Sequence, residues 1–314
     1  MNALLYHLDR GRFTSMLLFV TAFLGISIVQ TNADILYVDE FYQGNIVKVD
    51  TSNGSVSPFV SGLSNPEGLA ADKSGNIYVA TQTAGVIDKI SPSGVITPFV
   101  TSLGGYYLSG MAFDSSGDLY VGANRYAGTY VSAIFKFSSS GALLSTWSWG
   151  ADGPGPLQPT GLAFDSSGNL WVTDYSGNAL YSISPSGTPT EIARMAVNPL
   201  GLVFGPDGNL YVANRSSGTI DEITSSGFIS TYASGLDNPS GLVFDQSGNL
   251  YTTDSPNGGD GTDITLVANG GGSIFTTGLD EPLYVIDVPE PAPFALLCLG
   301  LPLMLKFLRK PLKD

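Results

Sequence analysis

Carboxylates and amides recur at two fixed places in a phrase that this 314-residue chain repeats. In the phrase, a Gly-led apolar run enters an Asp-led polar turn that ends in Gly, and a second apolar run follows. Polar side chains collect just before the first run and just after the second. The candidate ligands at these places are Glu67, Asp174, Asn214 and Asp254. Oxygen ligands from several strands suit Ca²⁺, so the pattern predicts a cation site if the side chains converge.

Residue types exclude several kinds of catalysis. The only histidine is His7 and the only cysteine is Cys298, and both lie in apolar terminal regions. The central part therefore has no Ser-His-Asp or Cys-His system and no ordinary zinc site. Glu67 and Asp254 would allow acid–base chemistry only if they faced each other at a useful distance. We expect no catalytic residue, although the sequence leaves the question of an enzyme open.

The charge balance excludes a nucleic-acid partner. The chain has 13 Lys and Arg against 27 Asp and Glu, a net charge of −14. Within residues 34–288 there are 24 acidic and 7 basic residues, a balance of −17. Such a surface repels phosphates and favours cations or neutral ligands.

The repeated phrase indicates the elements that must position these side chains. Its five copies begin at Gly68, Gly110, Gly161, Gly201 and Gly241, and a period near forty residues of short strands and turns is typical of β-propeller blades. A sixth unit opens with only the second apolar run, Ile35–Val38, and its missing strand reappears as Pro282–Asp287. We therefore predict an all-β, six-bladed propeller of four-stranded antiparallel blades, with its ring closed by the C-terminal strand.

The phrase Pro-x-Gly-Leu-Ala/Val-Phe-Asp-x-x-Gly-Asn-Leu-Tyr-Val resembles NHL repeats over about residues 35–288. More loosely, it is similar to the six-bladed gluconolactonases and streptogramin lyases. The gluconolactonase resemblance implies an axial metal held by Glu, Asn and Asp side chains, and Glu67 and Asp254 match two of these. Thr160 and Leu200 stand where that family has amides. The streptogramin-lyase resemblance implies catalytic histidines, which residues 34–288 do not contain.

Two interpretations of these polar residues therefore stay open. One is a Ca²⁺-dependent, lactonase-like hydrolase that uses Glu67, Asp174, Asn214 and Asp254. The other is a set of solvated polar groups at a channel mouth.

Two further features allow binding. Gly258–Asp263 matches one copy of a Gly-Gly-x-Gly-x-Asp calcium repeat, with Asp260 and Asp263 as ligands, or else it is a surface loop. The third unit is the longest and contains Trp147 and Trp149, with Tyr126, Tyr130 and Tyr175 near them in the repeats. These aromatic residues would stack on sugar rings or a protein partner, or Trp147 and Trp149 would pack inward.

Both ends of the chain look like targeting segments. Arg10, Arg12 and the apolar run from Met16 to Val29 predict a signal peptide over residues 1–33, with a retained membrane anchor as the alternative. Pro289, Glu290 and Pro291 precede an apolar run and a basic cluster, an order that resembles the PEP-CTERM sorting signal. That resemblance implies an exosortase-type processing enzyme and transient retention in the inner membrane through residues 292–308.

We therefore expect a signal peptide (1–33), an NHL-like propeller (34–288) and a sorting segment (289–314), with apolar helices flanking the propeller. The expected protein is exported by a bacterium of Gram-negative type to the cell surface or the extracellular matrix. There it binds polysaccharide or a protein without catalysis, and the Ca²⁺-dependent hydrolase is the alternative.

Overall fold

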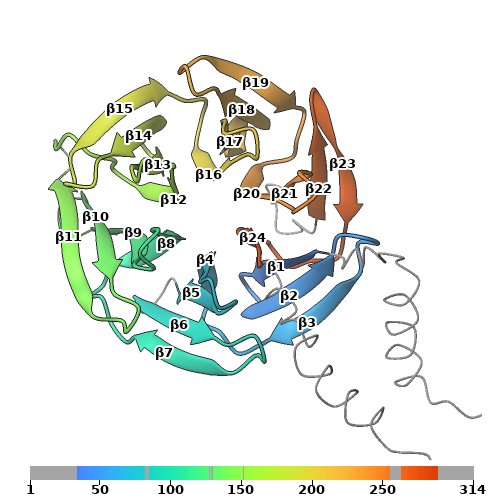
Figure 1. Ribbon diagram of the computed structural model, residues 1–314, viewed down its shortest axis with the longest axis horizontal. Coiled ribbons are helices and arrows are strands. Elements are labelled where there is room, and N and C mark those ends of the chain that lie inside the picture. The colour runs from blue at the N-terminus through green and yellow to red at the C-terminus, as the bar shows by residue number, and fades with distance from the viewer. Residues whose placement is uncertain are drawn as a thin grey trace, which may run out of the picture. The chain divides into compact units, whose positions relative to one another are not determined.

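The computed structural model describes residues 34–81, 85–126, 128, 130–150, 152–254 and 263–288. Over these residues the chain forms six four-stranded antiparallel sheets arranged as blades around a central axis (Figure 1). This confirms the predicted all-β, six-bladed propeller. In every blade the first strand lies nearest the axis and the fourth lies at the outer edge (Figure 1).

Blade 1 contains both ends of the ring, and blades 2 and 3 follow it in chain order. Blade 1 consists of β24 (Val285–Asp287), β1 (Ile35–Glu40), β2 (Asn45–Asp50) and β3 (Val56–Val60). Blade 2 consists of β4 (Pro66–Ala71), β5 (Ile77–Thr81), β6 (Val86–Ile90) and β7 (Ile96–Val100). Blade 3 consists of β8 (Tyr107–Phe113), β9 (Leu119–Tyr126), β10 (Tyr130–Phe137) and β11 (Leu143–Gly150).

Blades 4, 5 and 6 come next in chain order. Blade 4 consists of β12 (Pro159–Phe164), β13 (Leu170–Asp174), β14 (Ala179–Ile183) and β15 (Pro189–Arg194). Blade 5 consists of β16 (Pro199–Phe204), β17 (Leu210–Asn214), β18 (Thr219–Ile223) and β19 (Ile229–Ser234), with a 3₁₀ turn, η1 (Arg215–Ser217), after β17. Blade 6 consists of β20 (Pro239–Phe244), β21 (Leu250–Asp254), β22 (Asp263–Ala268) and β23 (Gly271–Thr276).

The C-terminal strand closes the ring as predicted. β24 pairs antiparallel with β1, with Val38 opposite Val285 and Leu36 opposite Asp287. This register matches that of the other blades, where Leu202 lies opposite Val212 and Phe204 opposite Leu210. The closing strand removes the free edge that β1 would otherwise present to the channel.

The Asp-led turns that join first and second strands are held by their own carboxylates. In blade 2, Asp72 Oδ1 accepts the backbone N–H groups of Ser74 and Asn76 at 2.9 and 3.0 Å. Gly75 in the same turn has φ +77°, a conformation in which a side chain is strained. Asp165 in blade 4 accepts the same two bonds, at 2.9 Å each. The aspartates of the repeated phrase are therefore structural.

The Gly that leads each phrase allows the innermost strands to approach one another closely. A Cβ atom on Gly110 would overlap the carbonyl oxygen of Thr160 in blade 4, and one on Gly201 would overlap that of Ser240 in blade 6. Neither glycine has a positive φ, so close backbone contact is the reason for Gly at these positions. Apolar side chains from both strand faces then fill the spaces between blades.

The predicted targeting segments are in other parts of the chain. The predicted signal peptide (1–33), the Pro289–Glu290–Pro291 motif and the two flanking apolar helices lie outside the described residues. No helix within the described ranges is long and apolar enough to cross a membrane.

Candidate functional site

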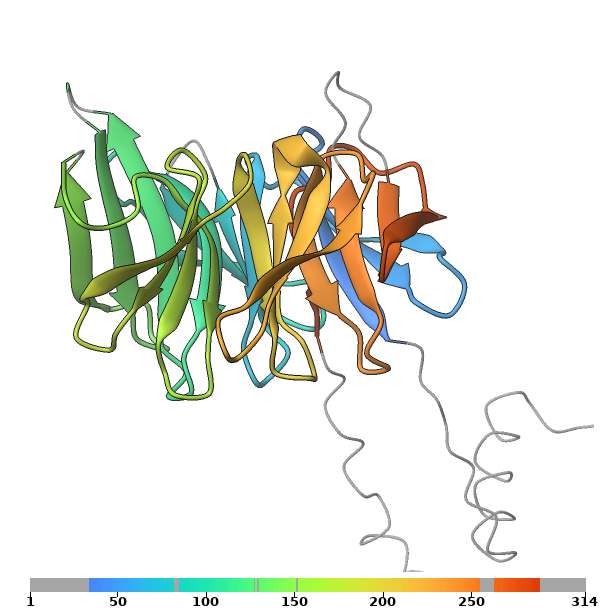
Figure 2. The same cartoon turned by 90° about the horizontal axis from the view of Figure 1, so that it is seen from above.

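The register of the sheets brings the predicted site positions to one face of the ring. Asp174, Asn214 and Asp254, which end second strands, lie opposite Pro159, Pro199 and Pro239, which open first strands. We call this side the mouth face, and it is uppermost in Figure 2. The Asp-led turns lie on the opposite side, which we call the turn face. Sharing a face does not make these residues one site, because their side chains have different partners.

Asp174 holds the connection that enters blade 4. Its Oδ2 accepts the backbone N–H of Leu157, and its Oδ1 accepts those of Gln158 and Gly177, at 2.9 to 3.0 Å. The residue is only 1% exposed. A carboxylate that already accepts three backbone hydrogen bonds has little capacity left for a ligand. Asp174 is therefore explained by the loop that its carboxylate holds together.

Asn214 and Asp254 are also engaged within their own blades. Asn214 Nδ2 donates to Asp221 Oδ2 at 2.8 Å, and the Thr265 hydroxyl donates to Asp254 Oδ2. Burial, with the neighbouring charges of Asp237 and Asp263, raises the pKa of Asp254 to about 7. One oxygen of each residue, Oδ1, accepts no hydrogen bond from the described part of the chain.

Glu67 lies on the mouth face in blade 2, at the start of β4, where its charge acts on Asp39 and Tyr284. Over the described residues, no three His, Cys, Asp or Glu side chains form a group that could hold a metal ion. Asp263 opens β22 directly opposite Asp254, whereas Asp260 lies outside the described residues. The predicted cation sites therefore stay predictions.

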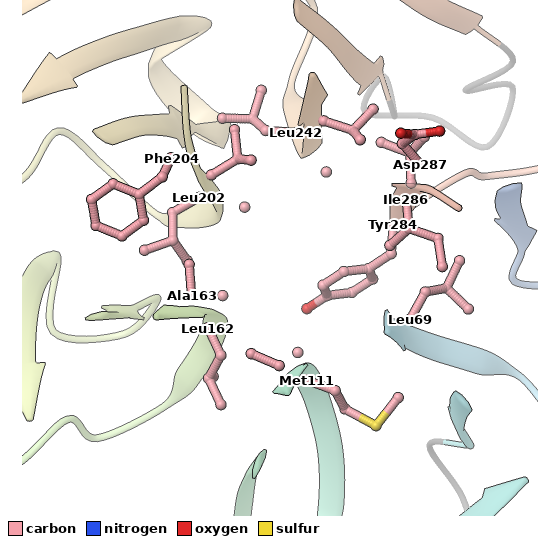
Figure 3. A pocket seen from close by; sticks show the side chains of 18 of the residues that line it. Leu69, Met111, Leu162, Ala163, Leu202, Phe204, Leu242, Tyr284, Ile286 and Asp287 are labelled. Carbon is pink, nitrogen blue, oxygen red and sulfur yellow. The ribbon is translucent and has the colours of Figure 1, made fainter. Parts of the chain in front are cut away.

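Tyr284 occupies the axis, and the sequence reasoning overlooked it. In the register of blade 1 it takes the position that Gly68, Gly110, Gly161, Gly201 and Gly241 hold in the other blades. Its side chain crosses the central space (Figure 3), and its hydroxyl donates to the carbonyl oxygen of Thr160 in blade 4 at 3.1 Å. Burial, together with the nearby charges of Glu67 and Asp39, raises the pKa of Tyr284 well above its usual value. One side chain therefore reaches across the channel from blade 1 to blade 4.

Asp39 holds the backbone of Tyr284 in place. It is fully buried, and its Oδ1 accepts the N–H groups of Leu283 and Tyr284 at 2.9 and 2.7 Å. At the same repeat position, the Thr173 hydroxyl accepts from Gly161 N–H at 2.7 Å and donates to the Leu200 carbonyl of the next blade at 2.6 Å. Burial raises the pKa of Asp39 well above its ordinary value, and the Glu67 charge adds to the shift.

The signal for this pair was present in the sequence. Aligning Pro282–Asp287 with the phrase puts Tyr284 under the leading Gly. Asp39 directly follows the second apolar run, where other copies have Ala, Gly or Thr. Because a Gly position inside a propeller faces a neighbouring strand closely, a Tyr there must point into the axis.

Blade 3 carries exposed aromatic side chains on the mouth face. Tyr107 is 52% exposed and Tyr126 is 66% exposed, and the two lie at the ends of paired strands β8 and β9. Strands β9, β10 and β11 have eight residues each, so the mouth-face end of this blade stands high in Figure 2. Beside them the Arg125 guanidinium lies 4.7 Å from the centre of the Tyr106 ring.

The two tryptophans of blade 3 pack inward, as one of our alternatives predicted. Trp149 is 8% exposed and belongs to the core between blades 3 and 4. Trp147 packs on Tyr120, with ring centroids 5.5 Å apart. Tyr175 is also half-buried, against a different part of the core. Of the candidate stacking residues whose side chains are described, Tyr126 is the one well exposed.

Comparison with known proteins identifies a family for this arrangement. The sequence model of the virginiamycin B lyase family matches residues 9–259. No curated protein matches the chain.

Solved structures show the same fold. Virginiamycin B lyase from Staphylococcus aureus is 20% identical, with a TM-score of 0.55 over 70% of this chain and 73% of that one. A variant of that enzyme with a histidine changed to alanine, described as catalytically inactive and solved with quinupristin, has 19% identity, a TM-score of 0.54 and the same two coverages. The nidogen/laminin complex is 17% identical, with a TM-score of 0.66 over 81% of this chain and 98% of that one. At these identities the likeness concerns the fold alone.

Proposed function

This chain belongs to the virginiamycin B lyase family, and we propose that it is a non-catalytic member that binds a polysaccharide or a protein partner. The observation that carries this proposal is the commitment of Asp174, a candidate ligand, to three backbone amides. A site that is already satisfied by its own loop supports a structural role and leaves binding to the exposed groups of the mouth face.

The histidine content supports the same conclusion. A Staphylococcus aureus virginiamycin B lyase becomes catalytically inactive when one histidine is changed to alanine. The only histidine of this chain, His7, lies outside residues 34–288, where the propeller is. Lyase chemistry that needs an imidazole on the propeller therefore has no residue to carry it.

The surface for a ligand is the aromatic edge of blade 3. Tyr107 and Tyr126 offer flat faces with a polar hydroxyl end, which suit the apolar faces and hydroxyl edges of sugar rings. The balance of −17 over residues 34–288 disfavours acidic polysaccharides. The proposed ligand is therefore a neutral or amino-sugar polysaccharide, or a protein partner with a basic or neutral surface.

Export and sorting form part of the proposal. The apolar run near the N-terminus and the Pro289–Glu290–Pro291 motif with its basic end support a protein that leaves the cytoplasm. An exosortase-type enzyme would then process residues 289–314 at the inner membrane. Loss of the C-terminal basic cluster in a cell fraction of mature protein, measured by intact mass, is the result we expect.

A Ca²⁺-dependent lactonase-like hydrolase is the second candidate. The observation in its favour is the pair of buried oxygens, Asn214 Oδ1 and Asp254 Oδ1, that accept no hydrogen bond from the described residues. Calorimetric titration of the full chain with Ca²⁺ tests it. Micromolar binding that Glu67→Ala abolishes would support the hydrolase. If the heat of injection equals the heat of dilution, Ca²⁺ does not bind and the hydrolase would have no Lewis acid.

A glycan array probed with the full chain tests the binding proposal. We expect neutral or amino-sugar polysaccharides to bind, and Tyr107→Ala with Tyr126→Ala to lower the signal at least tenfold. Phe228→Ala is the matched control, because Phe228 is 67% exposed and lies in the β18–β19 turn on the opposite face. Equal loss in the control, or binding that survives both tyrosine changes, would contradict the proposed surface.

A further inference from the structure

On the turn-face side of Tyr284 the channel contains a cavity. Its volume is about 400 Å³, and Tyr284 lies among the residues that line it (Figure 3). The other lining residues come from the first strands, from the leading Gly onward toward the turn face. The Tyr284 side chain, which reaches across the axis to Thr160, lines the end of this cavity nearest the mouth face.

Most side chains that line the cavity are apolar, and they occupy equivalent positions in the six blades. One aliphatic or thioether side chain comes from each blade at the position after the leading Gly. These are Leu69, Met111, Leu162, Leu202, Leu242 and Val285. An apolar cavity of about 150 Å³ is large enough to bind benzene, so this one has room for a longer hydrocarbon body.

One charged residue belongs to this wall. Asp287 takes the position that Phe204 and Phe244 hold in blades 5 and 6, and all three line the cavity. Figure 3 shows its carboxylate at the edge of the apolar space. Its Oδ1 accepts no hydrogen bond from any described residue.

The surroundings of Asp287 add further negative charge. Asp34, at the start of β1, and Asp245, in the turn after β20, both act on it electrostatically. Within the described ranges, none of these three carboxylates forms an ion pair with a Lys or Arg. Asp34 accepts the Gln246 N–H, and Asp245 accepts the Tyr251 hydroxyl. The apolar cavity therefore has an uncompensated negative edge.

We propose that this cavity is a binding site for a small amphipathic cation, a primary amine with a hydrocarbon body. The hydrocarbon body fills the space between the six blade side chains, and the ammonium group pairs with the Asp287 carboxylate. Burial of the apolar body supplies most of the affinity, since it removes hydrocarbon from water. The carboxylate supplies the preference for a cation over a neutral or anionic ligand of the same length. This site is distinct from the mouth face, on which the proposed function rests.

Titration of the full chain with n-octylamine, n-octanol and octanoate at pH 7.5 tests the proposal. We expect the amine to bind at least tenfold more tightly than the alcohol, and octanoate not to bind. Asp287→Asn should reduce amine affinity to that of the alcohol while leaving the alcohol unchanged. Leu202→Phe, which fills the cavity, should weaken both. Asp237→Asn, on the mouth face, is the matched control and should change neither.

A pH series on the unaltered chain gives an independent reading. Burial, with the charges of Asp34 and Asp245, raises the pKa of Asp287 to about 6. Amine affinity should therefore increase between pH 5 and pH 7.5, whereas alcohol affinity stays constant. This series decides the matter if Asp287→Asn fails to fold. Octanoate binding as tight as that of octylamine, or no binding of amine and alcohol, would overturn the proposal.

Discussion

Blade 1 differs from the other five blades because two distant parts of the chain build it. In blades 2 to 6 a short polar turn joins the first and second strands, led by Asp in all but blade 5, and the first strand carries the leading Gly. In blade 1 the first strand is β24, and Tyr284, Asp39 and Asp287 stand where the repeats have Gly, a small residue or Thr, and mostly Phe. Because the first strand of blade 1 does not follow the repeated phrase, this blade carries the polar groups that reach the axis and its cavity.

The difference separates two reasons for a residue to be present. Positions shared by the five repeats are explained by packing, as Gly110 and Gly201 are by close strand contacts. The departures in blade 1 place a hydroxyl and two carboxyl groups where the repeats have none or only an alcohol. These departures cost packing or desolvation, so they are the positions to examine for function.

Removing the closing strand should have the largest effect. Deletion of residues 282–288 removes the β24–β1 pairing, both Asp39 hydrogen bonds, and the buried side chains of Leu283 and Val285. Each of those side chains contributes about 1.5–3 kcal/mol on burial. We expect the free energy of unfolding to fall by several kcal/mol in urea denaturation. Deletion of 308–314 is the control, and equal stability of the two truncated chains would contradict closure.

A methyl group at a repeat Gly should have the next largest effect. Gly201→Ala places a Cβ against the Ser240 carbonyl oxygen and must separate blades 5 and 6. We expect a loss of about 2–3 kcal/mol, as for overpacked cores. Gly150→Ala is the control, since nothing lies within 4 Å of its added Cβ and its φ is not positive. Similar melting temperatures for the two variants would contradict the close-contact explanation.

The sequence predicted the fold well because the repeat encodes local and global structure together. The leading glycines, the Asp-led turns and the second apolar runs each define one part of a blade, and their copy number defines the ring. The closing strand was predictable because Pro282–Asp287 matches the first strand that the N-terminal unit lacks.

The candidate site was predicted less well, because its polar residues bond to partners that no repeat identifies. Asp174 is held by the backbone of Leu157 and Gln158, in the connection between β11 and β12. The sequence left open whether Trp149 is exposed or packs inward, and the structure buries it against blade 4. The importance of Tyr284 follows from a carbonyl group on the opposite side of the ring, a contact between residues 124 positions apart.

Replacing Asp39 by Thr restores the side chain of Thr173 and Thr253 and should change the pH dependence of stability. Because burial raises the pKa of Asp39 above 3.8, the folded chain keeps this proton where the unfolded chain has lost it. Its stabilising contribution is therefore complete below about pH 4 and is lost as the pH rises toward the folded value. A difference of one pH unit between the folded and unfolded pKa values corresponds to about 1.4 kcal/mol in the free energy of unfolding.

Urea denaturation between pH 4 and pH 8 measures this effect. We expect Asp39→Thr to lose less stability than the unaltered chain over that range. Asp254 and Asp287, whose pKa values are raised to about 7 and about 6, act with the same sign in both proteins and cancel in the comparison. Parallel curves for the two proteins would show that Asp39 holds no extra proton in the folded state.

Removing only the hydroxyl of Tyr284 should have the smallest effect and isolates the contact across the ring. Tyr284→Phe keeps the ring in the channel but leaves the Thr160 carbonyl without the 3.1 Å hydrogen bond that blade 1 supplies. A buried hydrogen bond contributes about 1 kcal/mol, so we expect a loss near that value in urea denaturation. Tyr107→Phe, at an exposed position, is the matched control and should be neutral. If both variants have the same free energy of unfolding, Tyr284 contributes only by filling the channel. The hydrogen bond between blades 1 and 4 then adds nothing to stability.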